Sequence, residues 1–285
     1  MSGYLPHTRK QSAEISRAHQ FEPPVIRYML IASTVIFTFI FLVLPVVIVF
    51  EQALSKGFAN YVNNLLENDT IAAIKLTLIA ATSAVVINTV FGLAAAYAIT
   101  RFNFRGKNIL VSLIDVPFMV SPVVSGLLFV LLFGSKGWFG NILDDLNIKI
   151  IFSTPGIILA TCFVTFPFVA RELMPVMQSI GKEFEEAALV LGAKPLKMFI
   201  KVTLPSIKWG LLYGVMLCSA RAIGEFGAVS VVSGHIRGAT NTVPLHVEIL
   251  YNEYNFAGAF SIASILMVIA IISLILRSFI DNKAD

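Results

Sequence analysis

The sequence predicts an all-α protein that crosses a membrane several times. Of its 285 residues, 57% are hydrophobic and only 13% are charged, and the mean hydropathy is +0.83. Soluble domains carry about 25% charged residues, so the composition lies far outside their range. The apolar residues gather in runs of about 20, the length that a helix needs to cross the hydrocarbon core. Together these observations predict a polytopic membrane helical bundle with about six transmembrane helices.

We expect six spans, at residues 28–50, 71–100, 108–133, 155–170, 209–232 and 257–280. The first is too long for the apolar core of a signal peptide, so we keep it in the mature protein. The fourth is the weakest, because it is short and interrupted by a proline, although its helix could continue toward Met177. A polar tail at residues 1–27 precedes the permeation domain of residues 28–280, and residues 281–285 form a short tail.

The orientation follows from the Lys and Arg residues between the spans, because loops rich in them stay in the cytoplasm. Basic residues gather in three segments: the N-terminal one (Arg9, Lys10, Arg17, Arg27), the second loop (Arg101, Arg105, Lys107) and the fourth loop (Arg171, Lys182, Lys194, Lys197, Lys201, Lys208). The first, third and fifth loops hold far fewer. This alternation predicts that both termini face the cytoplasm. It also explains the net charge of +4 without a nucleic-acid partner.

Residues 171–208 form the long cytoplasmic loop of this topology, yet they are patterned like packed helices. Four residues at helical spacing predict one apolar face: Phe184, Ala187, Ala188 and Leu191. Gly192 follows where a helix would end in a left-handed cap, Pro195 can open a second short helix, and Pro205 is expected to stop the run before Trp209. The pattern alone leaves two uses open: docking to a partner, or an interfacial element that packs beneath the bundle or touches lipid headgroups.

This loop resembles the EAA signature of binding-protein-dependent ABC importer permeases, which reads E-A-A, three residues, G, nine residues, I-x-L-P. The chain has Glu186-Ala187-Ala188, then Gly192, then Val202-Thr203-Leu204-Pro205 at these spacings, with Val202 for the usual Ile. The resemblance implies a type I ABC importer permease in which the segment is a coupling helix that docks into a groove on an ATPase subunit. It assigns the ATPase-coupling role to five residues: Glu186, Ala187, Ala188, Gly192 and Ala193.

Other stretches of the sequence indicate which branch of these permeases the chain resembles. Residues 115–126 and 220–229 look like the oxyanion branch of these permeases, and residues 100–106, 171–177 and 244–250 are similar to the W-type subunit of sulfate/thiosulfate permeases. This implies a bacterial-type inner membrane, a T-type second permease, two ATPase subunits and a soluble sulfate-binding protein as partners. The T-type subunit and the permease for molybdate, a related oxyanion, are the relatives from which the chain must be distinguished.

Two groups of charges lie inside predicted spans. Arg221 and Glu225 are four residues apart in the fifth span, and charges at that depth should not face lipid. They are either an i,i+4 ion pair that faces a neighbouring helix or a candidate translocation path for a divalent oxyanion; we favour the ion pair. An intramembrane aspartyl protease needs two facing aspartates, and Asp115 in the third span has no evident second aspartate in another span. We therefore expect Asp115 to cap or contact a helix. Pro117 and Pro122 follow it, so a broken helix that lines a cavity is an alternative.

The sequence favours a conduit over an enzyme. It lacks a GxxxxGK[ST] loop, so ATP hydrolysis would come from a partner chain. An intramembrane serine hydrolase is the alternative from a different class, but Ser125-Gly126 and Ser233-Gly234-His235 do not provide a nucleophile beside a base. A passive channel would not explain the coupling loop. The four histidines have no metal-ligand spacing, the two cysteines read as small core residues, and we expect no cofactor and no metal site.

Overall fold

The computed structural model describes residues 24–284, with side chains described through residue 275. Every element of regular structure in that range is helical, which confirms the all-α prediction there. Residues 1–23 of the predicted N-terminal tail lie outside the described residues, as do His7 and His19. The chain divides into two compact units, residues 1–51 and 52–285, and each is described by itself.

The described part of the first unit, residues 24–51, lies within one long apolar helix. Helix α2 (Pro24–Thr38), the π-helical turn η2 (Phe39–Val43) and helix α3 (Leu44–Leu54) form a continuous run of 31 residues. The wider π turn lies just before Pro45, whose missing N–H cannot take part in a regular helical ladder. Neither α2 nor η2 buries any residue within the chain, as expected for a helix that is apolar all round and is covered by lipid or by other membrane helices.

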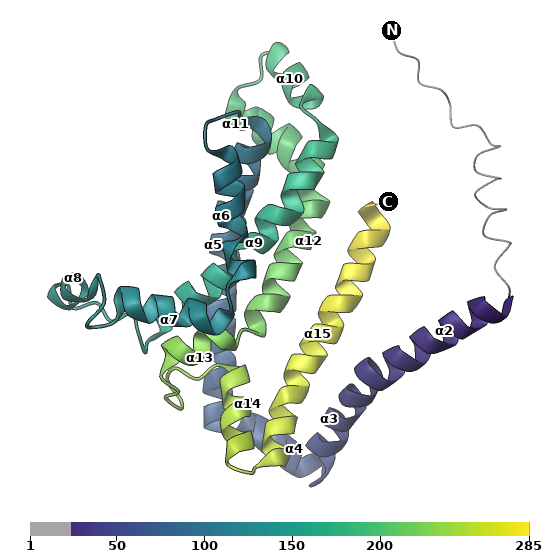
Figure 1. Cartoon of the computed structure of the whole chain (residues 1–285), viewed down its shortest axis with the longest axis vertical. Helices are drawn as coiled ribbons and strands as arrows, with labels where there is room; N and C mark the ends of the chain where they lie inside the picture. Colours follow the sequence, from purple (N-terminus) through teal and green to yellow (C-terminus); the bar gives the residue numbers. More distant parts are fainter. Residues whose placement is uncertain (1–23, 285) are drawn as a thin grey trace. The chain divides into compact units, whose positions relative to one another are not determined.

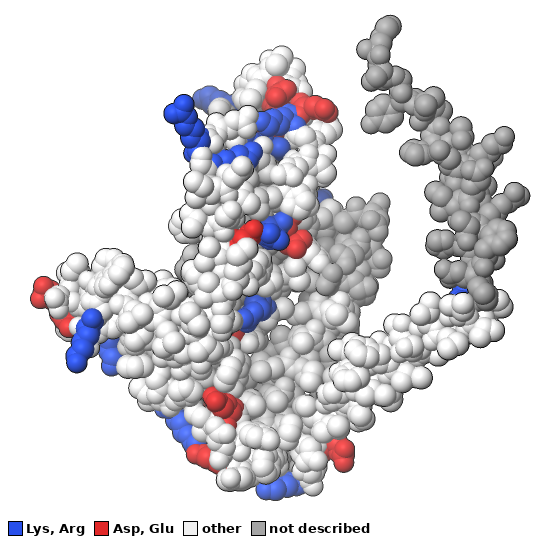
Figure 2. Space-filling view, in the orientation of Figure 1, with Lys and Arg blue, Asp and Glu red and all other residues white. Residues whose placement is uncertain are grey.

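The second unit holds the remaining helices (Figure 1), which in chain order are α4 (Phe58–Leu66), α5 (Asn68–Arg101), α6 (Lys107–Met119), α7 (Pro122–Phe133), α8 (Gly140–Asp145), α9 (Thr154–Ile180), α10 (Glu183–Val190), α11 (Pro195–Met198) with the π-helical turn η3 (Phe199–Thr203), α12 (Leu204–Ile223), α13 (Gly227–Ser233), α14 (Val243–Asn252) and α15 (Phe256–Ala284). Helix α10, helix α11 and the ends of α5 and α9 lie together at one end of this unit, which we call the α10 end (Figure 1). Charged side chains gather there, and smaller groups of charged side chains also show in the middle and at the opposite end of the unit (Figure 2).

Helices α5, α9 and α12 form the centre of the second unit and pack against one another. Small residues allow their backbones to approach closely. A Cβ added to Gly92 of α5 would lie 2.9 Å from the Cβ of Val169 in α9, and one added to Gly210 of α12 would lie 2.9 Å from Cγ2 of Val176. Gly214 also faces α9, so the Gly210-xxx-Gly214 pair packs two helices of the same chain.

A polar cluster around Asn88 connects the same three helices at depth. The Asn88 amide donates to the Thr165 hydroxyl (2.8 Å) and to the carbonyl of Cys162 (3.0 Å), while the Cys162 thiol donates to the Asn88 carbonyl oxygen (3.0 Å). Cys218 of α12 is buried beside this amide. Both cysteines are free thiols within the helix packing, as the sequence suggested.

Two predicted spans are broken. Residues 108–133 are not one helix, because α6 and α7 meet at 109°. Residues 209–232 are interrupted too, because α12 ends at Ile223 and α13 begins at Gly227. The expected six spans therefore become five helices, within the described residues, that are long and apolar enough to cross a membrane, or six if the bent pair counts as one span. The prolines near the first break had indicated this alternative.

The two breaks lie against each other. A Cβ added to Gly126 of α7 would lie 2.7 Å from the carbonyl oxygen of Ala228, and one added to Gly227 would lie 2.8 Å from the Cβ of Pro122. Glycine at these two positions lets α7 and α13 cross in direct backbone contact. Irregular backbone at membrane depth is tolerated only where protein or a water-filled cavity covers it, so this crossing lies away from lipid.

Two other helices are longer than predicted. Helix α9 continues without a break from Thr154 to Ile180, past both Pro167 and Pro175, so the weakest predicted span is one of the central helices. The segment between α9 and α12 is correspondingly shorter than residues 171–208. Helix α15 extends to Ala284 and includes most of the predicted tail at residues 281–285. Prolines are tolerated in membrane helices because neighbouring groups satisfy the freed carbonyls.

Candidate functional site

The predicted helix, glycine turn and helix are present at the α10 end. Helix α10 ends in a left-handed turn at Gly192, whose φ is +83°. The N–H of Gly192 donates to the carbonyl of Leu189 (2.9 Å), and that of Ala193 donates to the carbonyl of Ala188 (3.0 Å). This pair of bonds is the Schellman motif that ends helices with a glycine. Three of the predicted coupling residues, Ala188, Gly192 and Ala193, thus build the turn itself.

The second helix continues further than expected. Helix α11 passes through the π-helical turn η3 directly into α12, giving one run from Pro195 to Ile223. Pro205 lies in the first turn of α12, so the expectation that it stops the run is wrong. The widened turn η3 precedes Pro205, which has no N–H to donate, and this is the position at which a π-helical turn accommodates a proline.

The apolar residues around the turn point away from the bundle. Val190 and Leu191 are each 87% exposed, Leu196 is 72% exposed and Phe184 is 65% exposed. We call these four residues the apolar tip. Glu186 and Ala187 are exposed as well. An interfacial element that packs beneath the bundle would bury its apolar face there, whereas exposed patches of this kind mark interaction sites.

One acidic side chain of α10 is buried instead of exposed. Glu185 accepts a hydrogen bond from the Thr203 hydroxyl (2.9 Å) at Oε1, and its Oε2 lies 2.8 Å from Nε of Arg101. Arg101 in turn donates from Nη1 to the carbonyl of Met177 (3.0 Å), and Lys182 Nζ donates to the carbonyl of Arg101 (2.9 Å). We call Glu185, Arg101 and Thr203 the α10 anchor.

The α10 anchor was not predicted from the sequence. The burial of Glu185 depends on the helices that pack against it, so spacing alone does not distinguish it from the exposed Glu186.

Arg221 and Glu225 form the ion pair that their spacing predicted. Arg221 Nη1 lies 2.5 Å from Glu225 Oε2, and the Glu225 side chain is 1% exposed. Glu225 lies in the break between α12 and α13, and its Oε1 accepts the backbone N–H of Ala228 (2.9 Å). The carboxylate therefore satisfies a free N–H in the first turn of α13, while the guanidinium balances its charge. Arg221 is 32% exposed, so one side of the pair remains accessible.

Asp115 also has a partner. Nε and Nη2 of Arg171 donate to its two carboxylate oxygens at 2.7 and 2.8 Å, joining α6 to α9. This fits the expected helix-contact role of Asp115. Arg171 was expected in the cytoplasmic loop, and this is wrong, because it lies inside α9.

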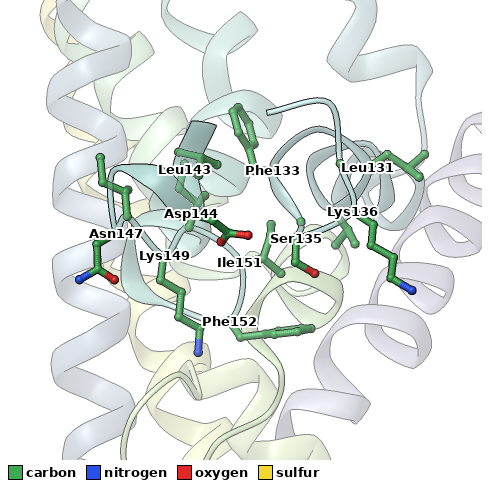
Figure 3. A pocket seen from close by; sticks show the side chains of 15 residues that line it. Leu131, Phe133, Ser135, Lys136, Leu143, Asp144, Asn147, Lys149, Ile151 and Phe152 are labelled. Atoms are coloured by element: carbon green, nitrogen blue, oxygen red, sulfur yellow. The ribbon is translucent and has the colours of Figure 1, made fainter. Parts of the chain in front are cut away.

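A cavity of about 610 Å³ lies where α7 ends and the chain turns back toward α9. In Figure 3 the Asp144 carboxylate points into this cavity, while the side chains of Lys136 and Lys149 extend away from its centre. A carboxylate in the interior repels an anion. The cavity is therefore a poor candidate for an oxyanion site.

The serines of the hydrolase alternative make only local contacts. Ser125 Oγ donates to the carbonyl of Ser121 (3.2 Å). Ser233 Oγ accepts the backbone N–H of His235 (3.2 Å). The first is a helix contact and the second belongs to a turn, so neither builds the hydroxyl–imidazole pair that nucleophilic catalysis requires.

The membrane-spanning part of the chain matches a known protein family. Residues 88–285 match the family described as "Binding-protein-dependent transport system inner membrane component". The chain belongs to this family. It is therefore a multi-pass inner-membrane subunit of a transport system, and the family assigns it no catalytic role.

Several relatives match most of the chain of this permease. The sulfate transport system permease protein CysW of Escherichia coli (strain K12) is 48% identical over 276 residues, which cover 96% of this chain and 95% of that protein. The CysW protein of Synechocystis is 46% identical over 90% of this chain and 94% of that protein. The CysT protein of Salmonella typhimurium is 35% identical over 86% of this chain and 88% of that protein.

A solved structure shares the fold of the permease. The crystal structure of a bacterial ABC transporter involved in the import of the acidic polysaccharide alginate aligns with a TM-score of 0.73, covering 96% of this chain and 98% of that one. The sequence identity is 18%, so this likeness concerns the fold alone. It confirms the predicted architecture of an ABC importer permease.

Proposed function

We propose that this permease is the W-type membrane subunit of an ATP-driven importer for sulfate or thiosulfate. The observation that carries the proposal is the 48% identity to a CysW protein over 96% of the chain. The identity to a T-type protein is lower, 35%, which favours the W type and leaves the T-type protein as the second permease. A related oxyanion such as molybdate is the alternative cargo.

The α10 end is the proposed contact with the ATPase. Glu186, Ala187, Ala188, Gly192 and Ala193 form the helix and turn that would enter a groove on an ATPase subunit, with the apolar tip around them. This chain and its second permease would each present one such segment to one of two ATPase subunits. Closure of the ATPases on ATP would then move both segments and switch the bundle between inward and outward access. ATP hydrolysis belongs to those subunits, because this chain has no phosphate-binding loop.

In this proposal the α10 end and both termini would lie in the cytoplasm, as the distribution of Lys and Arg predicts. A soluble sulfate-binding protein would then deliver its cargo at the opposite side, where α14 lies. The family description, which names a binding-protein-dependent transport system, supports a separate binding protein that delivers the cargo. Specificity for the anion would reside mainly in the binding protein, because a deep and tight anion site in the membrane would oppose release.

Arg221 and Glu225 are the candidate residues of the translocation path. The guanidinium is partly exposed beside the break between α12 and α13, where a passing divalent anion would meet a positive group. The Arg221→Gln variant tests this role: uptake should fall while the complex still assembles. Normal uptake by an assembled Arg221→Gln complex would leave the pair with a purely structural role.

Reconstitution tests the proposed function directly. Proteoliposomes that contain this permease, the T-type permease and the ATPase, with sulfate-loaded binding protein and ATP on their proper sides, should accumulate labelled sulfate. Omission of ATP or of the binding protein should abolish uptake. Uptake without either component would indicate a passive channel, and competition by molybdate but not by thiosulfate would indicate the alternative cargo.

A further inference from the structure

Helix α10 cannot hold its position by its own stability. It has eight residues, and helices shorter than about 12 residues are marginal in water. Its large apolar side chains Phe184, Leu189 and Val190 are exposed, so they do not fasten it to the bundle either. The fixed contacts of α10 must therefore lie on its other side, where Glu185 is only 8% exposed.

The contacts of Glu185 are directional and charged. One carboxylate oxygen accepts from the Thr203 hydroxyl and the other pairs with Arg101, at 2.9 and 2.8 Å. The Arg101 side chain is 6% exposed, so this pair is shielded from water and from salt. The charge-assisted hydrogen bond from Thr203 fixes an orientation more sharply than apolar contacts, which can slide, and Arg101 adds a buried ion pair without a hydrogen bond from its Nε.

The α10 anchor reaches all three central helices of the unit. Arg101 is the last residue of α5, and its Nη1 bonds the carbonyl of Met177 in α9. Thr203 ends η3 and immediately precedes α12. Lys182, one residue before α10, closes the arrangement through the carbonyl of Arg101. One carboxylate thus connects the docking helix to the ends of α5, α9 and α12.

We propose that Glu185 is the positioning residue that transmits movement of α10 to the three central helices. This rests on the proposed function of α10 as the ATPase contact. A displacement of the apolar tip by the ATPase would pull on α10, and the α10 anchor would carry the displacement into α5, α9 and α12 as one body. Without the carboxylate, α10 could still occupy its groove on the ATPase. Its movement would then deform the turn at residues 191–194 and would not reach the central helices.

The test compares two acids of the same helix. Glu185→Gln keeps the size and an acceptor for Thr203 but removes the charge opposite Arg101. Glu183→Gln makes the same charge change at an exposed position in the same turn and serves as the matched control. Each variant is reconstituted with the T-type permease, the ATPase and the sulfate-binding protein. The readouts are ATPase retained on the purified complex, basal ATP hydrolysis, hydrolysis stimulated by loaded binding protein, and sulfate uptake.

The Glu185→Gln complex should retain its ATPase and its basal hydrolysis. Its stimulated hydrolysis and uptake should fall roughly 2- to 30-fold, the range over which single residues in coupling networks act. The Glu183→Gln complex should behave as the wild type. The exchange of charges, Glu185→Arg with Arg101→Glu, should recover part of the loss, because the pair would be rebuilt with its direction reversed.

Two results would overturn the proposal. Wild-type stimulation and uptake in the Glu185→Gln complex would show that the carboxylate transmits nothing. Loss of ATPase binding or of folded protein in that variant, without recovery by the charge exchange, would assign Glu185 to stability alone. Failure of the proposed function itself looks different, because the wild-type complex would then show no stimulation by loaded binding protein.

Discussion

Replacement of Gly192 by aspartate should leave the permease folded and inserted while it disconnects ATP hydrolysis from transport. Gly192 ends α10 with a φ of +83°, a region that glycine enters without strain. A Cβ added there would meet no other atom within 4 Å. A side chain at this position therefore disturbs the chain itself only through its backbone preference.

The intramolecular cost of the change is small. The left-handed conformation costs an ordinary L residue about 1–2 kcal/mol, and Asp or Asn less, since their short polar side chains can bond locally. At a docked interface the cost is larger, because an unpaired carboxylate would be buried beside the apolar tip, and the effective penalty for a buried ion is several kcal/mol. Since every 1.4 kcal/mol is tenfold in affinity, the variant should bind the ATPase at least about 100-fold more weakly.

Gly192→Asn is the matched control, because it has nearly the same shape and tolerates the same φ but carries no charge. Gly192→Ala measures the backbone cost alone. The assay is ATP hydrolysis by the reconstituted complex with and without loaded binding protein, together with ATPase retention during purification. Membrane insertion and the thermal midpoint of the isolated permease report on folding.

The expected order of stimulated hydrolysis is wild type, then Ala and Asn, then Asp with almost none. Unchanged stimulation in Gly192→Asp would refute the docking role of the turn. Equal losses in the Asn and Asp variants would refute the electrostatic part of the argument and assign the effect to the backbone.

Three further predictions concern packing and charge elsewhere in the second unit. Asp115→Asn should lower the thermal midpoint of the detergent-solubilised protein, and a double-mutant cycle with Arg171→Gln should give a coupling of about 1 kcal/mol, kept small because that guanidinium is 54% exposed. Gly126→Val should cost about 1–3 kcal/mol or more, seen as reduced folded yield, because even its Cβ would lie 2.7 Å from the Ala228 carbonyl oxygen. Burial lowers the pKa of His246 below its ordinary 6.5, so the folded state binds fewer protons than the unfolded one and stability should fall as the pH drops below about 6.5. His246→Gln should remove that part of the pH dependence in thermal unfolding between pH 8 and 5.

Apolar length and charge were enough to predict most of the fold. The span expected at residues 71–100 is α5, Asn68–Arg101, because a long apolar run has few other uses. The breaks near residues 120 and 225 were harder to predict, since hydropathy does not record where the backbone bends. Pro117 and Pro122 indicated the first break, but α9 has two prolines in its interior, Pro167 and Pro175, and does not break. Whether a proline breaks a helix depends on whether neighbouring helices satisfy the freed groups, which is a tertiary property.

The location of the candidate site in the sequence could be predicted, but the contacts of its side chains could not. The spacing from Glu186 to Pro205 located the segment, and the left-handed turn falls at Gly192 as expected. Which of the two adjacent acids is buried was not predictable. Glu186 is exposed and Glu185 is buried only because η3 and α5 pack against one side of α10. The pairing of Asp115 with Arg171 likewise joins residues 56 positions apart, for which a single sequence carries no signal.

The break between α12 and α13 limits what Arg221 can do in transport. Glu225 uses one oxygen for the Ala228 N–H and the other for Arg221, so the acid supports the start of α13 and is paired with the guanidinium. An anion that took the guanidinium for itself would leave a buried carboxylate unpaired, a state that costs several kcal/mol. Gly227 holds the start of α13 against Pro122 of α7. Any such exchange must therefore accompany a movement of α13 against α7. If Arg221 belongs to the path, it acts while the helices shift and not as a resting anion site, which agrees with an importer that must release its cargo.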